Sequence, residues 1–110
     1  MSANLSINFY DLEEYLVDTY QDCIMGYSGI HYILKFPNGY GASIIKTFGS
    51  YGYEKDLWEM AILIFESMDL GPGPYEIAHN TSIIKNDCVL GNLSDDEVIE
   101  YLRKVKEIKD

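Results

Sequence analysis

Hydrophobic and polar positions alternate with a period of two over the middle of the chain, first in residues 30–36 and again in residues 42–48. A period of two is typical of a β-strand, because successive side chains of a strand point to opposite faces. Between the two runs, Pro37 presets φ, and Asn38-Gly39 tolerates the positive φ that a tight hairpin turn requires. The pattern therefore predicts a β-hairpin.

The apolar run from Leu57 to Phe65 fits two structures. Asp56 could cap a helix made of these residues, but an apolar run after a glycine-rich turn is also typical of a central strand buried on both faces. We favour the strand because the preceding hairpin offers an edge with which it can pair. Residues 70–74 then predict a loop, and residues 75–90 predict irregular structure with one short strand near residues 82–85.

The N-terminal part of the chain shows the longer period of a helix. From Phe9 to Tyr20 apolar residues recur at steps of three and four, and Asn8 precedes them as an N-cap. These residues predict a helix over 9–23.

The C-terminal part predicts a second helix, over residues 95–108. Ser94 and Glu97 have the spacing of a capping box, and Val98, Leu102 and Val105 form an apolar stripe. The whole pattern predicts an α+β fold in which a small antiparallel sheet of about three to four strands packs against both helices. A length of 110 residues suits a single domain over 1–110, with its sheet region over about 30–85.

The charge of the chain narrows the choice of partners. There are 18 acidic and 8 basic residues, so the net charge is −10, and residues 1–34 contain no Lys or Arg. Such a balance disfavours direct binding to nucleic acid or to an anionic membrane, and it favours a basic partner. The acidic residues of the first segment are either a solvated face that keeps the protein soluble or a surface that imitates phosphates.

Residues that could perform catalysis or hold a metal do not form a recognisable motif. Cys23 and Cys88 match no metal-binding pattern, and we expect both to be reduced, packed thiols. His31 and His79 have no nucleophile signature beside them. The acids Asp95 to Glu97 are explained by helix capping. The sequence predicts no catalytic residue, no metal and no cofactor. It shows no signal-peptide pattern and no apolar run long enough for a membrane span, so a cytoplasmic protein is expected.

The glycine-rich stretch from Phe36 to Tyr53 matches neither a Walker loop nor a GxGxxG loop, so nucleotide binding is disfavoured. Its tyrosines call for another explanation. Tyr40, Tyr51 and Tyr53 stand in or beside turns, and tyrosine is enriched at protein interfaces because it offers a large contact area with few rotors. We consider both a structural role at the ends of the sheet and a role as protein-binding residues.

The chain also resembles a group of small bacteriophage and prophage accessory proteins. The shared motifs are a Phe-x-Asn-Gly-Tyr-Gly-Ala-Ser hairpin, a Tyr-Gly turn, a Leu-Trp/Phe-Glu-x-Ala strand and a terminal Leu-Gly-x-Leu-x-Asp/Glu-x-Glu-Val helix; here they occupy residues 36–45, 51–52, 57–61 and 90–98. The match covers about two thirds of the chain and leaves out the acidic N-terminal segment. The resemblance implies a strand at 57–65. It implies no catalytic residue, and it points to proteins among which inhibitors of host defence are frequent.

These observations lead to one main hypothesis: an acidic phage-type protein that inhibits a host nucleic-acid-handling or defence protein in the bacterial cytoplasm, as an anti-CRISPR or anti-restriction protein does. The partner would have a basic or nucleic-acid-binding surface, and a dimer is one of the open oligomeric states. The expected contact residues are Asp11, Glu14, Asp18, Asp22, Tyr40, Tyr51 and Tyr53. One alternative is an immunity or antitoxin-like protein that blocks a cognate toxin. The least favoured is a small enzyme that uses Cys88 or His79.

Overall fold

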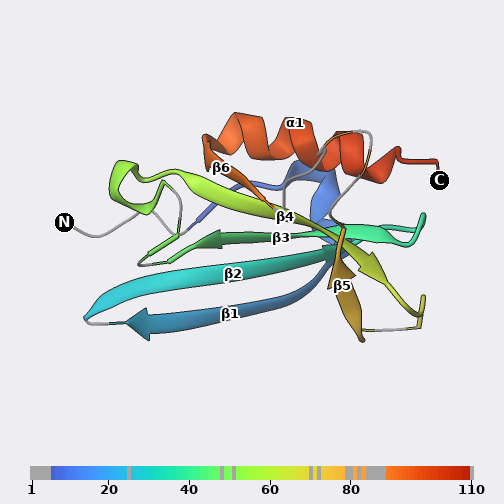
Figure 1. The fold of residues 1–110 in the computed structure, drawn as a ribbon, viewed down its shortest axis with the longest axis horizontal. Coiled ribbons are helices and arrows are strands. Elements are labelled where there is room, and N and C mark those ends of the chain that lie inside the picture. The colour runs from blue at the N-terminus through green and yellow to red at the C-terminus, as the bar shows by residue number, and fades with distance from the viewer. Residues whose placement is uncertain are drawn as a thin grey trace.

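A computed structural model describes residues 6–24, 26–47, 49–50, 52–69, 71, 73–78, 81, 83 and 89–109 (Figure 1). The elements follow in the order η1 (Tyr10–Tyr15), β1 (Leu16–Ile24), β2 (Tyr27–Lys35), β3 (Tyr40–Lys46), η2 (Tyr53–Lys55), β4 (Trp58–Phe65), β5 (Tyr75–Ile77), β6 (Leu90–Leu93) and α1 (Asp95–Lys106), where η marks a 3₁₀ helix.

The strands form one antiparallel sheet. Its order is β1-β2-β3-β4-β5, and β6 also pairs with β4. Strand β5 lies beside the end of β4, at Leu63 to Phe65, and β6 lies beside its start, at Trp58 to Met60. Figure 1 shows α1 lying across one face of this sheet, where it contacts mainly β3, β4 and β6.

The main core lies between α1 and the sheet. Its sheet side comes from alternate residues of the central strands, which are buried: Leu34, Ala42, Ile44, Trp58, Met60 and Ile62. The helix contributes the stripe Val98, Leu102 and Val105, all fully buried. A one-residue shift of any central strand would turn this apolar set away from the helix, so the alternation also sets the register.

The predicted hairpin is confirmed. The Phe36 N–H donates to the Tyr40 carbonyl at 2.8 Å, and Gly39 has a φ of +87°. The Asn38 side chain has a second task. Its Oδ1 accepts from the Tyr40 N–H, while its Nδ2 donates to the carbonyls of Val105, Lys106 and Ile108 at 2.9–3.1 Å. The turn residue therefore also satisfies carbonyls at the end of α1, which a helix leaves without partners.

The strand at 57–65 is confirmed as β4, and the C-terminal helix is confirmed as α1 with its capping box. The Ser94 hydroxyl accepts from the Glu97 N–H at 3.2 Å, and the Glu97 carboxylate accepts from the Ser94 N–H at 3.0 Å.

The helix predicted over 9–23 is wrong. Only residues 10–15 are helical, as the 3₁₀ helix η1, and Leu16–Ile24 is strand β1, which pairs with β2 along its length. Without β1, the backbone edge of β2 would lack a partner, and β-branched and aromatic residues such as Val17, Thr19 and Tyr20 suit a strand. An irregularity between Leu16 and Asp18 leaves Val17 unpaired in the ladder, which breaks the simple alternation that would have marked the strand.

The predicted number of strands is also wrong, because the described residues form six. Neither β5 nor β6 was predicted. Strand β5 is only three residues long, and β6 contains Gly91 and Asn92, two residues that strands disfavour; Asn92 has a φ of +57°. The short strand expected at 82–85 falls mostly on residues outside the described part of the chain. The structure is therefore a sheet covered by the C-terminal helix, and not a sheet packed against two helices.

Candidate functional site

Three exposed acidic residues lie within six positions of the chain, where η1 leads into the edge strand of the sheet. Glu13 and Glu14 belong to η1, and Asp18 belongs to β1, which is the edge strand. We call Glu13, Glu14 and Asp18 the acidic edge. None of the three forms an ion pair with another described residue. Asp22 lies further along β1, opposite Gly29 of β2. The structure thus brings two of the predicted contact residues, Glu14 and Asp18, into one region.

Asp11 has a different environment, because its carboxylate is paired. Arg103 of α1 donates from Nη1 to Oδ2 at 3.1 Å and from Nη2 to Oδ1 at 2.7 Å. This two-point contact holds the pKa of Asp11 below its ordinary value and raises the pKa of Arg103. Asp11 therefore links η1 to α1, and the guanidinium of Arg103 compensates the negative charge of its carboxylate.

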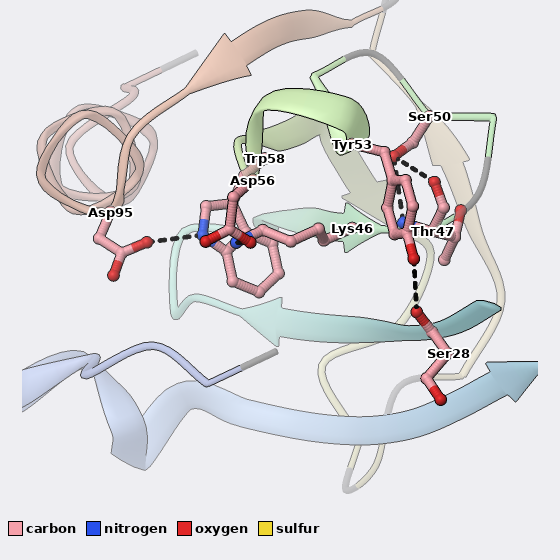
Figure 2. A network of polar contacts seen from close by, with 8 residues as sticks. All are labelled: Ser28, Lys46, Thr47, Ser50, Tyr53, Asp56, Trp58 and Asp95. Carbon is pink, nitrogen blue, oxygen red and sulfur yellow. Dashed lines mark hydrogen bonds and ion pairs between the residues drawn. The ribbon is translucent and has the colours of Figure 1, made fainter. Parts of the chain in front are cut away.

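The predicted tyrosines do not form one surface. Tyr40 starts β3, is half-buried and packs against the main core. Tyr53 lies in η2, beyond the other end of β3, and its hydroxyl donates to the Ser28 carbonyl at 3.2 Å (Figure 2). Tyr51 lies outside the described residues. The two described tyrosines therefore both make contacts within the fold, at opposite ends of one strand.

Among the side chains that the structure describes, the exposed aromatic ones are Tyr10 of η1, which is 62% exposed, and two tyrosines on the sheet face that α1 does not cover. Tyr20 of β1 stacks on His31 of β2 with ring centroids 4.5 Å apart and planes 15° from parallel. At the opposite edge, Tyr75 and Ile77 of β5 are each about two-fifths exposed. Between them a small buried cluster forms from Ile33, Leu63 and Phe65, with Val17 packed against it.

A buried lysine lies at the centre of a polar network on the helix side (Figure 2). The Lys46 side chain is 1% exposed, and its Nζ lies 3.1 Å from Asp56 Oδ1 and 4.3 Å from the centre of the Trp58 ring. Trp58 Nε1 donates to Asp95 Oδ1, in the first turn of α1, at 2.7 Å. The ion pair, the cation–π contact and the hydrogen bond join β3, β4 and α1, so this network holds the fold together.

The glycine-rich turn after β3 borders a hollow of about 320 Å³, lined by Gly49, Ser50, Gly52, Tyr53, Glu54, Lys55 and Asn92. Ser50 Oγ donates to the Thr47 carbonyl and accepts from the Thr47 N–H, so the hydroxyl is used in the turn. Gly52 has a φ of +96°, and a Cβ there would lie 3.0 Å from Leu57 Cβ. Glycine is thus needed at this position for backbone geometry and space.

The two residues named for a catalytic alternative, Cys88 and His79, lie outside the described residues. Cys23 is described, and the prediction that its thiol is packed is wrong: it is exposed on the edge strand. In the described part of the chain, no group of three or more His, Cys, Asp or Glu side chains is placed to hold a metal ion.

Sequence reasoning missed Lys46 and the Tyr20–His31 stack. The sequence did contain a signal for Lys46, because Ala42, Ile44 and Lys46 occupy the same face of a strand. A lysine that alternates with core residues in this way is expected to be buried and to need a partner for its charge. The stack could not be found while residues 9–23 were assigned to a helix, because cross-strand neighbours follow from the pairing of β1 with β2.

No helix among the described residues is long and apolar enough to cross a membrane. Comparisons with protein-family models, with curated proteins and with solved structures found no match to this chain.

Proposed function

We propose that this protein acts by binding a basic surface of another protein through its acidic edge, and that the partner is a nucleic-acid-handling or defence protein of a bacterial host. The observation that carries the proposal is the acidic edge itself: Glu13, Glu14 and Asp18 are exposed and carry no ion pair with a described residue. The resemblance to phage accessory proteins supports the choice of a host target.

The position of these acids, in an edge strand and in the 3₁₀ helix that leads into it, favours one kind of partner. An edge strand presents unpaired backbone N–H and C=O groups, which can pair with another chain. Acidic side chains beside that edge oppose pairing with a second copy of the same strand, because like charges would meet. They favour a partner strand or surface rich in Lys and Arg, which the net charge of −10 would also attract over a distance.

Binding at a site that normally accepts phosphates would make the protein an inhibitor without chemistry of its own. Such a surface already carries Lys and Arg side chains placed for nucleic acid. A carboxylate offers those cations the same charge-assisted hydrogen bonds that a phosphate oxygen does. The expected role is competition with DNA or RNA for that surface.

A plating assay tests the proposal. The protein is expressed in bacteria that carry a CRISPR–Cas or a restriction–modification system, and the cells are challenged with a phage that the system blocks. The test variant combines Glu13→Gln, Glu14→Gln and Asp18→Asn. The control variant combines Glu66→Gln, Glu76→Gln and Asp96→Asn, three exposed acids elsewhere.

Both variants lose three negative charges, so they differ only in where the charge is removed. We expect the native chain and the control to restore plating, and the edge variant to lose at least tenfold of that effect. Equal plating by the two variants would contradict a role for the acidic edge. Inhibition that is unchanged when DNA is added in excess to the purified target would contradict competition with nucleic acid.

A further inference from the structure

Two lysines are buried in the part of the chain that the structure describes, and their surroundings differ. Lys46 has the carboxylate of Asp56 at 3.1 Å. Lys35 is 8% exposed, yet no carboxylate of a described residue lies within ion-pair distance of its ammonium. Buried charges in proteins are ordinarily paired with an opposite charge. In a chain with a net charge of −10, a buried cation without a carboxylate partner calls for an explanation.

The contacts of Lys35 leave part of its hydrogen-bonding capacity unused. Its Nζ donates to the carbonyls of Asp69 and Gly71 at 2.9 Å and 3.1 Å, and it lies 5.1 Å from the centre of the Phe65 ring. An ammonium group has three N–H donors. The described residues therefore provide acceptors for two of them, and both acceptors are neutral.

Lys35 lines a groove of about 270 Å³ at the start of β1, together with the residues that accept its hydrogen bonds. The remaining lining is mostly apolar and comes from Tyr15, Val17, Phe36, Pro37 and Met68. Met68 is half exposed and stands at the surface. The lining residues thus include one buried cation, Lys35, and one exposed acid, Asp69, among mostly apolar walls. A few polar groups that fix the orientation of an apolar body are typical of a small-ligand site.

We propose that this groove binds a small organic carboxylate with an apolar body about the size of one aromatic ring. The carboxylate would accept a charge-assisted hydrogen bond from Lys35 Nζ, and the ring would pack between Val17 and Met68.

Acids flank the groove, since Asp69 lines it and Glu14 and Asp18 are the chain neighbours of Tyr15 and Val17. These acids are exposed and screened by solvent and salt, whereas the buried ammonium of Lys35 is screened much less, so pairing with Lys35 outweighs their repulsion. The proposal is independent of the acidic edge and of any protein partner.

The probe is 3-phenylpropionate, titrated into the ¹⁵N-labelled protein at physiological salt while backbone amide shifts are followed by NMR. Two further probes separate the contributions: 3-phenylpropanamide keeps the ring and removes the charge, and acetate keeps the charge and removes the ring. We expect millimolar binding of 3-phenylpropionate, with the largest shifts at Val17, Phe36, Asp69 and Gly71. The amide and acetate should each bind about tenfold more weakly, since each loses one of the two interactions.

Matched variants locate the site. Lys35→Met keeps the length of the side chain and removes the charge, and Lys55→Met makes the same change at an exposed lysine in the other hollow. We expect Lys35→Met to weaken 3-phenylpropionate about tenfold and Lys55→Met to leave its affinity unchanged. If Lys35→Met proves unfolded, the acid-to-amide comparison on the native chain still decides the outcome. Equal affinity for the acid and the amide, shifts centred away from the groove, or no shifts at saturating probe would each overturn the proposal.

Discussion

The two faces of the sheet are made by the same strands, but they differ in how many apolar side chains they bury. The face under α1 is a continuous core that includes Trp58, Ile44 and Leu102, all fully buried. The other face has one small cluster around Ile33, flanked by exposed tyrosines. The comparison shows that alternation alone does not make both faces alike. A helix supplies apolar area on one side, and solvent limits how much the other side can bury.

The difference between the two faces also implies different roles, stability for the covered face and recognition for the edge and the open face. Residues of the helix-covered face should have the largest effect on the free energy of unfolding, and residues of the edge and the open face should have smaller effects. Urea unfolding of the variants measures these differences in the free energy of unfolding.

Trp58→Ala should have the largest effect, a loss of about 3–5 kcal/mol in the free energy of unfolding. The substitution empties the centre of the helix-covered core, ends the cation–π contact with Lys46 and leaves Asp95 without the indole donor. Trp58→Phe keeps most of the volume and should lose clearly less. If the two variants unfold at the same urea concentration, the ring volume is not what matters at this position.

Ile44→Ala and Ile33→Ala compare the faces directly, because both isoleucines are at most 2% exposed and lie on neighbouring strands. We expect a loss of about 4 kcal/mol for Ile44 under the helix and about 2 kcal/mol for Ile33, within the usual range for this change. The cavity at Ile33 opens toward a thinner cover and can relax more easily. An equal or greater loss at Ile33 would show that the open face is as important for stability as the covered one.

Asn38→Ala tests how the helix is held on its face. The side chain donates to three carbonyls at the end of α1, so its loss leaves part-buried acceptors without a partner, at a cost of about 2 kcal/mol. The neighbouring exposed turn residue gives the control, Pro37→Ala, for which we expect about 0.5 kcal/mol. Amide exchange of residues 102–106 should accelerate in Asn38→Ala alone.

The double variant Tyr75→Ser, Ile77→Ser should change the free energy of unfolding by no more than about 0.5 kcal/mol per residue, because both side chains are already two-fifths exposed. Its unfolding midpoint should stay close to that of the native chain. A loss comparable with that of Ile33→Ala would mean that β5 covers the small cluster more firmly than its exposure indicates.

The ion pair between Asp11 and Arg103 should be visible in the pKa of Asp11 and hardly in stability. Its folded-state pKa lies below the ordinary value of 3.8, so any stabilisation is present above that value and is lost as the pH falls through the depressed pKa. NMR titration of the carboxyl carbon should show the depressed pKa, and Arg103→Gln should return it toward 3.8. An unchanged pKa in that variant would mean that the pair does not form in solution.

The acidic edge illustrates how far the sequence could go toward the candidate site. The excess of acids and the absence of cations before Lys35 are evident from composition. Their arrangement was not, because the helix predicted for 9–23 would have placed Glu14 and Asp18 one turn apart on a single helical face, whereas the structure places them in two different elements. Strand β1 places Asp18 on a sheet edge, and that placement follows from its pairing with β2.

Local signals determined the hairpin at 36–40, the strand at 58–65 and the capped helix from Asp95. Turn geometry and capping act within a few residues, whereas the apolar run at 58–65 also suits a helix and is a strand because the neighbouring hairpin offers it an edge. Tertiary structure decided the rest: the conversion of Leu16–Ile24 into an edge strand, the two short strands beside β4, and the difference between Lys35 and Lys46. Those features depend on which backbone edges and which charges meet in space, and neighbouring residues in the chain do not encode that.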